Sequence, residues 1–148
     1  MRKLCVLERD LFFALTNQVQ DTAHYLDLDT GAVIPVFDFN RNEILTMVQD
    51  NPERYIRLVP QSFRQGMEMM ERFIATVSRE DLRARLRQAI KTGRAFSQFR
   101  QVLGDYPGEM KRWQQFRRMM LVEPLKEKLR QRDIELVLVS EPEPGSVQ

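Results

Sequence analysis

The chain has 148 residues, of which 43% are hydrophobic and 30% are charged, and these values are typical of a globular protein of domain size. No stretch approaches the ~18 consecutive apolar residues of a membrane span, which excludes a membrane-embedded protein and leaves a cytoplasmic location as our expectation. One cysteine (Cys5) excludes an internal disulfide, and one histidine (His24) adds too few ligands for an ordinary zinc site, so we expect no metal and no cofactor.

The formal net charge is only +2, but it is unevenly distributed along the chain. Residues 1–78 carry 8 basic and 11 acidic side chains, residues 79–118 carry 11 and 4, and residues 119–148 carry 4 and 6. The middle of the sequence is therefore a basic block between mildly acidic flanks. A block of this sign favours acidic partners, among them nucleic acid.

The first predicted elements are a short helix and a β-hairpin. Apolar side chains recur at spacings of three and four within residues 10–17, which predicts an amphipathic helix. β-Prone runs on either side of Asp29-Thr30-Gly31 predict a hairpin over residues 23–37. Pro35 cannot donate a hydrogen bond to a neighbouring strand, so we expect the second strand of the hairpin at a sheet edge.

A second helix and a third strand are predicted after the hairpin. Asn40 is suited to cap a helix over residues 41–49, and Glu43, three residues later, completes the capping-box pattern. Alternating apolar residues then predict a strand over residues 54–59, which Pro60 closes.

Helices are predicted to dominate the rest of the chain. Ser62 is suited to cap the first of them, and Ser78, with Asp81 three residues later, is suited to cap the second. The expected inward faces of these two helices carry Phe63, Met67, Met70, Ile74 and Val77, and then Leu82, Leu86, Ala89 and Ile90.

Two further helices are predicted before the C-terminal strand. The first is broken by Gly104 and Pro107, and the second begins at about Gly108 and is expected to kink or end at Pro124. Their expected apolar positions are Phe96, Phe99, Leu103 and Tyr106 in the first, and Met110, Trp113, Phe116 and Met120 in the second. Residues 134–139 are β-prone and offer a last strand.

These elements predict an α+β fold with a small antiparallel sheet of three or four strands packed against four or more helices. We expect one domain over residues 1–139, with helices concentrated in its C-terminal two thirds. Residues 140–148 hold two prolines and a glycine and are expected to form a disordered tail. Whether residues 134–139 join the sheet is left open by the sequence.

The predicted hairpin offers the only arrangement that resembles a catalytic site. Asp27 and Asp29 flank its turn with His24 upstream, and Asp29-Thr30-Gly31 matches the tripeptide of aspartic proteases. That chemistry requires a second copy of the loop, which the sequence lacks, and nothing nominates a nucleophile for His24. Asp and Gly are also ordinary turn residues. A hydrolase is therefore the least favoured of our hypotheses.

The basic block offers candidate binding residues. Arginine and lysine side chains fall four apart on the predicted helix that begins after Ser78, opposite its apolar stripe, and more follow on the next two helices. A solvated helix face explains this pattern most simply. If the side chains gather in space, they would neutralise phosphates, and Trp113 or Phe96 would offer a ring for base stacking. The candidate residues are Arg83, Arg87, Lys91, Arg94, Arg117, Arg118 and Trp113.

Several phrases of the sequence occur together in one known family. They are Tyr25-Leu-Asp-Leu-Asp-Thr-Gly-Ala-Val33, Arg54-Tyr55-Ile56, Phe73-Ile74, Leu82 with Leu86, Gly93-Arg94-Ala95-Phe96-Ser97-Gln98-Phe99 and Trp113-Gln114-Gln115-Phe116. Over roughly residues 8–136 the chain resembles the bacterial uncharacterised protein family numbered 0158. It departs from the usual pattern near Asp29, where Glu is usual, and at Arg94, where Gly is usual. The resemblance implies a bacterial, cytoplasmic protein and no established activity.

We therefore expect a non-enzymatic binding or regulatory protein that contacts a protein partner through its helical surface. The alternative is a nucleic-acid-binding protein that uses the basic block over residues 79–118. The less favoured third hypothesis is a hydrolase with its carboxylates at residues 27–29. The sequence identifies neither the partner nor the oligomeric state.

Overall fold

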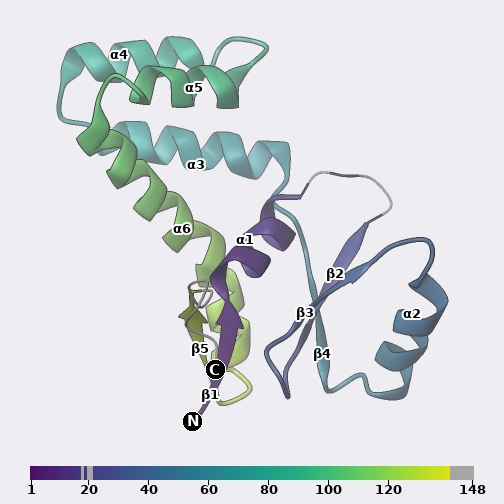
Figure 1. Cartoon of the computed structure of the whole chain (residues 1–148). Helices are drawn as coiled ribbons and strands as arrows, with labels where there is room; N and C mark the ends of the chain where they lie inside the picture. The colour runs from purple at the N-terminus through teal and green to yellow at the C-terminus, as the bar shows by residue number, and fades with distance from the viewer. Residues whose placement is uncertain (18, 20–21, 141–148) are drawn as a thin grey trace, which may run out of the picture. The chain divides into compact units, whose positions relative to one another are not determined.

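A computed structural model describes the whole chain except residues 18, 20, 21 and 141–148. The described residues form six helices and five strands, which confirms the predicted α+β class, and Figure 1 shows their order. The chain divides into two compact units: unit 1 holds Met1–Gln61 and Glu123–Gln148, and unit 2 holds Ser62–Val122. One domain over residues 1–139 stays a prediction, because two such units can still fold together. The predicted tail, except for Ser140, lies outside the described residues.

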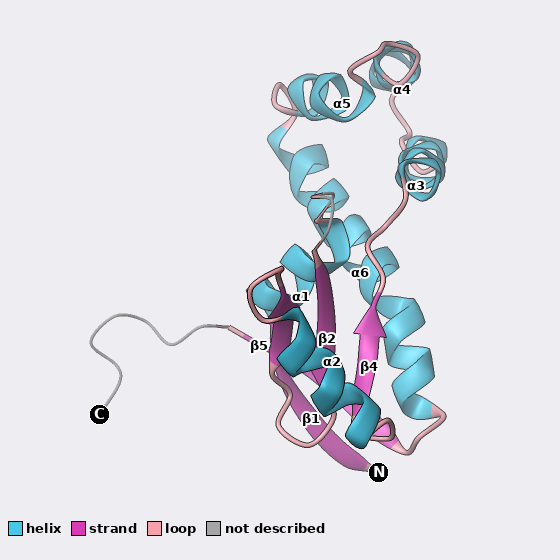
Figure 2. Ribbon diagram, turned by 90° about the vertical axis from the view of Figure 1, so that its right-hand side faces the viewer, coloured by secondary structure: helices cyan, strands magenta, loops and turns pink. Residues whose placement is uncertain are grey.

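Unit 1 contains both sheets of the protein. A parallel pair is formed by β1 (Arg2–Leu7) and β5 (Ile134–Val139), and an antiparallel sheet of order β3-β2-β4 is formed by β2 (Ala23–Asp27), β3 (Val33–Val36) and β4 (Tyr55–Leu58). Helix α1 (Glu8–Thr16) packs against β1 and β3. Helix α2 (Arg41–Asp50) lies over one face of the antiparallel sheet (Figures 1 and 2).

The antiparallel sheet confirms the predicted hairpin. Tyr25 lies opposite Ile34 on one side and opposite Arg57 on the other, so β2 is the central strand. Pro35 lies on the edge strand β3, where its missing N–H costs no hydrogen bond within the sheet.

Strand β5 does not join this sheet but pairs in parallel with β1, a strand that was not predicted from the sequence. The register places Leu4 opposite Leu136, and both side chains are buried. More than 120 residues separate the two strands, and no local sequence pattern predicts that strands so far apart will pair. Strand β1 also runs directly into α1 without a turn residue that would mark its end.

The turn of the hairpin packs against the backbone of β1 at one glycine. Gly31 has a φ of +80°, a conformation that L-residues with a side chain rarely adopt. A Cβ atom at this position would lie 2.0 Å from the carbonyl oxygen of Cys5. Gly31 is therefore required twice, for the turn and for the close approach of the turn to β1.

Unit 2 is built from helices alone: α3 (Phe63–Ala75), α4 (Glu80–Ala89), α5 (Ala95–Leu103) and the first part of α6 (Pro107–Arg130). Ser62 caps α3 as predicted, and the Gln65 side chain completes a capping box. The other two caps are corrected: Ser78 lies one residue too early for α4, and the Asn40 side chain bonds Pro35 and Phe37 instead of α2.

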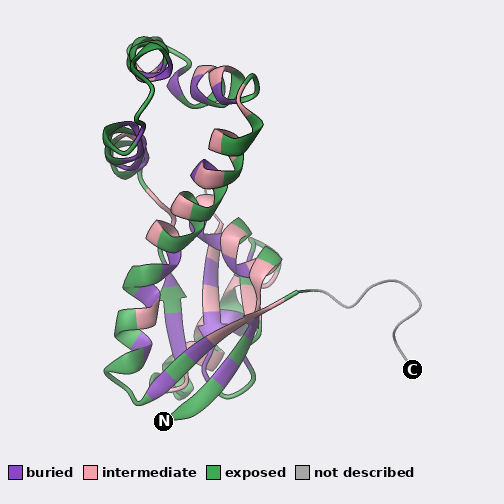
Figure 3. Cartoon of the chain, turned by 90° about the vertical axis from the view of Figure 1, so that its left-hand side faces the viewer, coloured by how far each residue is buried: buried purple, intermediate pink, exposed green. Residues whose placement is uncertain are grey.

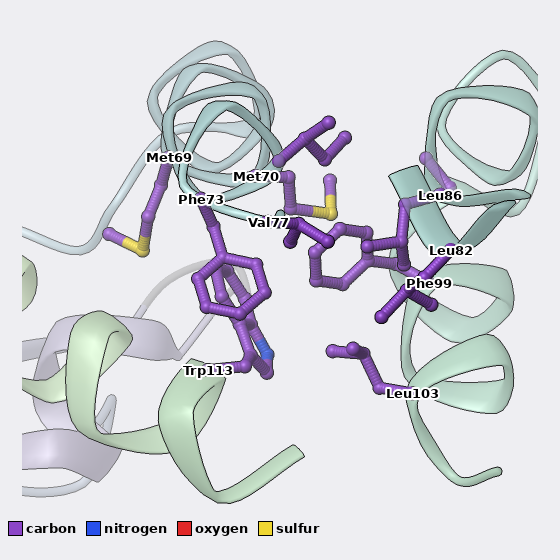
Figure 4. Packing of buried hydrophobic residues seen from close by; sticks show 11 residues of the cluster. Met69, Met70, Phe73, Val77, Leu82, Leu86, Phe99, Leu103 and Trp113 are labelled. Carbon is purple, nitrogen blue, oxygen red and sulfur yellow. The ribbon is translucent and has the colours of Figure 1, made fainter. Parts of the chain in front are cut away.

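The hydrophobic core of unit 2 is an aromatic cluster between its helices. The buried residues follow one side of each helix (Figure 3), and the rings of Phe73, Phe99 and Trp113 point toward one another (Figure 4). Trp113 lies 4.8 Å from Phe99 and 5.3 Å from Phe73, measured between ring centroids. Edge-to-face pairs at such distances stabilise a core by about 1 kcal/mol each beyond the area they bury.

Two expectations for the helices are corrected. Of the kink or end expected at Pro124, the end is wrong, because helix α6 continues to Arg130. Leu125 and Leu129, which follow the proline, are buried, and their burial offsets the lost backbone hydrogen bond. Phe63 is not in the core and is 63% exposed, since it begins α3 ahead of Met69, the first residue of that helix in the cluster.

Candidate functional site

The carboxylate of Asp27 at the end of β2 is fully occupied by the protein itself. Its Oδ1 accepts hydrogen bonds from the backbone N–H groups of Asp29 (2.9 Å) and Thr30 (3.4 Å). Arg54 donates to both oxygens, through Nε at 3.0 Å and through a terminal nitrogen at 2.9 Å. The hydrogen bond from Arg54 lowers the pKa of Asp27 to about 2. Asp27 therefore closes the hairpin turn and holds it to the start of β4.

His24 does not join this carboxylate. Side chains alternate along a strand, so His24 and Leu26 share one face of β2 while Asp27 points to the other. His24 is buried with its ring edge-to-face on Phe13 at 5.7 Å, and burial lowers its pKa, which keeps it neutral near pH 7. The candidate base and the candidate acid of the hydrolase hypothesis therefore lie on opposite faces of β2 and do not converge. No cluster suited to hold a metal ion is found in the described residues.

Two arginines of unit 2 contact Tyr106 and stabilise the packing of the helices around it. Arg79 lies over the ring at 4.9 Å and pairs with Asp81 at 2.8 Å. Arg85 donates to the Tyr106 hydroxyl at 3.2 Å and pairs with Asp105 at 3.3 Å. These contacts hold the turn between α5 and α6 against α4, so both arginines have a structural task.

Arg83 and Arg112 are occupied in the same way. Arg83 donates to the carbonyl oxygen of Val77 at 3.3 Å, and it is half-buried. Arg112 donates to the Thr76 hydroxyl at 3.0 Å and lies over the ring of Phe73 at 4.9 Å. Arg83 stays a predicted binding residue, although its half-buried guanidinium bonds the backbone just after the end of α3.

Seven of the other cations of unit 2 have no ion pair in the part of the chain that the structure describes. Unit 2 contains 13 basic and 6 acidic residues, a formal net charge of +7, while the rest of the chain contains 10 and 15 and carries −5. Five of the six acidic residues pair with neighbouring arginines. Within the described part of the chain, the cations of unit 2 that have no ion pair, here called the unpaired cations, are Arg72, Arg87, Lys91, Arg94, Arg100, Lys111 and Arg117.

Three unpaired cations lie close together in the sequence. Arg87 is in the last turn of α4, Lys91 lies two residues after that helix ends, and Arg94 directly precedes α5. On the next helix, Arg100 lies near Arg117 of α6. Arg117 keeps solvent contact, yet protein atoms crowd its guanidinium and lower its pKa, and the like charge of Arg100 lowers it further. Neither member of this like-charge pair has an ion pair among the described residues.

An exposed aromatic pair adjoins these cations. Phe63 at the start of α3 and Phe96 at the start of α5 meet edge-to-face, with ring centroids 5.6 Å apart and planes at 75°. Phe63 is 63% exposed and Phe96 is 38% exposed. Phe96 and Arg100 are four residues apart on α5 and therefore share a helix face.

Apart from half-buried Arg83, the structure separates the predicted binding residues into three groups. Arg87, Lys91, Arg94 and Arg117 are exposed and unpaired, while Arg118 is exposed but engaged in an interaction. Trp113 is corrected, because it is only 5% exposed inside the aromatic cluster and offers no ring face to a base.

Two residues of the exposed face were not predicted from the sequence. Phe63 was assigned to the core, and Arg100 was counted in the basic block but not selected. The spacing of Phe96 and Arg100 was the available signal, since residues four apart on a helix lie side by side.

The comparisons with known proteins agree with the resemblance of the sequence motifs. The sequence model of the uncharacterised protein family (UPF0158) matches residues 1–146. The chain is 28% identical to UPF0158 protein PA5073 of Pseudomonas aeruginosa over 136 residues, which cover 91% of this chain and 88% of the relative. No solved structure matches the chain. No helix in the described residues combines the length and apolar character needed to cross a bilayer. Because the match extends through both compact units, the chain belongs to the uncharacterised protein family UPF0158.

Proposed function

We propose that this chain is a non-enzymatic nucleic-acid-binding protein and that unit 2 supplies the binding surface. The observation that carries the proposal is the imbalance of charge in unit 2. Five of its six acidic residues pair with neighbouring arginines, whereas the unpaired cations have no carboxylate partner among the residues that the structure describes. A solvated helix of a globular protein needs no such excess. A polymer of phosphates neutralises it and releases counterions on binding.

Two features support nucleic acid over an acidic protein. The unpaired cations extend over three consecutive segments, from Arg87 at the end of α4 through Arg94 to Arg100 on α5. An evenly charged polyanion can contact all of them without a special sequence. Arg100 and Arg117 repel each other, and a phosphate placed between two guanidinium groups would relieve that repulsion.

The expected result is a steep salt dependence of binding to a fluorescent oligonucleotide, measured by anisotropy. If the protein neutralises about three phosphates, its affinity for the oligonucleotide should fall by a factor of about ten or more between about 50 and 200 mM salt. The double change Arg87→Glu and Lys91→Glu should reduce the slope of log K against log salt by about 1.4 or more, because two contacts are lost. Both residues are exposed and unpaired, so folding should be unaffected.

The matched control is the double change Arg57→Glu and Lys128→Glu, two exposed cations of unit 1 on β4 and α6, which alters the net charge by the same amount. This variant should leave the salt slope unchanged. Equal loss in both variants would point to a general effect of net charge and contradict the proposal. Equal competition by polyglutamate and by an oligonucleotide of the same charge would also contradict it, in favour of an acidic protein.

A protein partner, the role first expected from the sequence, is a second candidate because of a different aromatic pair. Phe37 and Phe39 stack with centroids 5.4 Å apart in the segment between β3 and α2, and Phe39 is 86% exposed. Asn40 fixes this segment by accepting a hydrogen bond from the Phe37 N–H at 2.7 Å and donating to the Pro35 carbonyl at 3.1 Å. A rigid, exposed aromatic pair in an acidic unit suits a basic, apolar segment of another protein.

A photo-crosslinking phenylalanine analogue in place of Phe39 tests this candidate in cells that produce the chain. We expect one discrete adduct that maps to a basic segment of a single protein and disappears when Phe37→Ser is added. The analogue placed at exposed Gln49 on α2 is the control. Identical adduct patterns at both positions, or none at Phe39, would exclude this candidate.

A further inference from the structure

We infer that the nucleic acid bound by unit 2 is single-stranded and that its bases stack on the exposed pair Phe63 and Phe96. This inference rests on the proposed function and names its ligand class. The pair lies within unit 2, and its cationic neighbours are Arg94, two residues before Phe96, and Arg100, one helical turn after it. A nucleotide presents a phosphate and a flat ring close together, and this face offers a counterpart to each.

The local structure holds both rings in place without burying them. The capping box of Ser62 and Gln65 fixes the first turn of α3, on which Phe63 stands. The buried side chains of Ala95 and Phe99 anchor the first turn of α5 on either side of Phe96. Each ring is therefore attached to the ordered first turn of a helix, so little conformational freedom remains to be lost when a ligand binds.

The orientation of the rings leaves room for a base. Because the two planes meet at 75°, the edge of one ring lies against the face of the other. Such a pair cannot cover every ring face, and Phe63 in particular remains mostly exposed. The other aromatic rings of this unit's core, among them Phe73, Phe99 and Trp113, pack on one another and have no face to offer.

Stacking on a side chain selects single strands over duplexes. In a duplex the faces of the bases are covered by their neighbours, whereas unstacked bases of a single strand can lie on aromatic rings. Every base has such a face, so this contact should be tolerant of sequence. An acidic peptide would satisfy the cations but would gain nothing from the rings unless it carried aromatic residues of its own.

The experiment compares three probes of matched length, roughly 16 nucleotides: oligothymidylate, an abasic strand with the same phosphates and a duplex. At the same salt concentration, we expect the whole chain to bind oligothymidylate at least about tenfold more tightly than it binds the abasic strand or the duplex. The double change Phe63→Leu and Phe96→Leu should lower affinity for oligothymidylate to that for the abasic strand. Binding to the abasic strand and the salt slope should stay as they are.

Two further variants keep the test free of folding effects. Phe63→Trp retains a stacking ring, so binding should persist, and the new fluorescence should be quenched by oligothymidylate but not by the abasic strand. Phe37→Leu with Phe39→Leu, the exposed pair of unit 1, should change nothing.

The outcomes separate the two proposals. Equal binding of all three probes, with the salt slope still reduced by Arg87→Glu and Lys91→Glu, would overturn the single-strand inference and leave the proposed function in place. Absence of salt-dependent binding to every probe would overturn both. Preference for the duplex over both single strands would assign the surface to a different nucleic-acid form and would also overturn the inference.

Discussion

Gly31→Ala is expected to destabilise unit 1 by roughly 2–5 kcal/mol. The new Cβ would lie 2.0 Å from the carbonyl oxygen of Cys5, a backbone atom that cannot rotate away. The positive φ adds about 1–2 kcal/mol for a residue with a side chain, and forcing a methyl group into packed structure adds about 1–3 kcal/mol. The turn would have to move off β1 or change its conformation.

Gly93→Ala is the matched control for this change. A Cβ at Gly93 meets no atom within 4 Å, and its φ is not positive. Alanine there should be neutral or stabilise by up to about 1 kcal/mol, because it restricts the unfolded chain. Urea unfolding followed by amide exchange in β1 and β2 measures the effect in unit 1, whereas fluorescence of the single Trp113 reports on unit 2. Equal effects of the two substitutions would contradict the packing argument.

Local chemistry in the sequence was sufficient to predict most elements. The hairpin followed from a glycine-containing turn between β-prone runs, and the helices followed from apolar spacing that reappears as buried Leu82, Leu86 and Phe99. The cap at Ser62 was also predicted, because its partner is three residues away. Contacts within a few residues leave a readable pattern.

Longer-range features were not predicted. The pairing of β1 with β5 depends on contacts far apart in the chain, and neither strand has a turn that points to the other. Asn40 has a good capping residue type, but its side chain is recruited by Pro35 and Phe37 of the preceding strand and loop. Two competing partners at similar distance cannot be ranked from residue type alone.

In the candidate site too, local features were predicted from the sequence and features that depend on distant contacts were not. The excess of positive charge was visible in the sequence, but which cations are available depends on where their neighbours fold. Arg83 donates a hydrogen bond to the backbone carbonyl of Val77, and Trp113 is buried in the core. Phe63 was misassigned because helical spacing gives the direction of a side chain but not the point at which the opposing helices stop. Exposure is a tertiary property.

Some of the motifs that carried the family resemblance have a structural task. The segment Tyr25–Val33 contains Asp27 and Gly31, and Arg54-Tyr55-Ile56 contains the arginine that binds Asp27. Together they close the hairpin and hold it against β4 and β1. The Asp-Thr-Gly tripeptide is therefore explained by its turn geometry, and a protease activity is not needed to account for it.

Asp27→Ala is expected to destabilise unit 1 by about 3 kcal/mol at neutral pH. The change removes the acceptor of two backbone N–H groups and leaves Arg54 without its bidentate partner. Hydrogen bonds to a charged group contribute roughly 1.5–3 kcal/mol, and the largely buried carboxylate strengthens them. Asp29→Asn is the control, because Asp29 is exposed and its contact with Arg54 is 3.4 Å, so a change within about 0.5 kcal/mol is expected.

The acid dependence of stability distinguishes this ion pair from simple turn capping. The folded pKa of Asp27 is about 2, below the ordinary value of 3.8, so between these values the unfolded chain binds a proton that the folded chain does not. Lowering the pH through this window therefore removes about 2 kcal/mol of stability, which is fully present only above about pH 5. In Asp27→Asn the amide oxygen can still accept from the turn, but no proton is bound. The free energy of unfolding in urea, measured from about pH 5 down to about pH 2, should fall more steeply in the natural chain than in Asp27→Asn. An equally steep fall in Asp27→Asn would place the titrating group elsewhere.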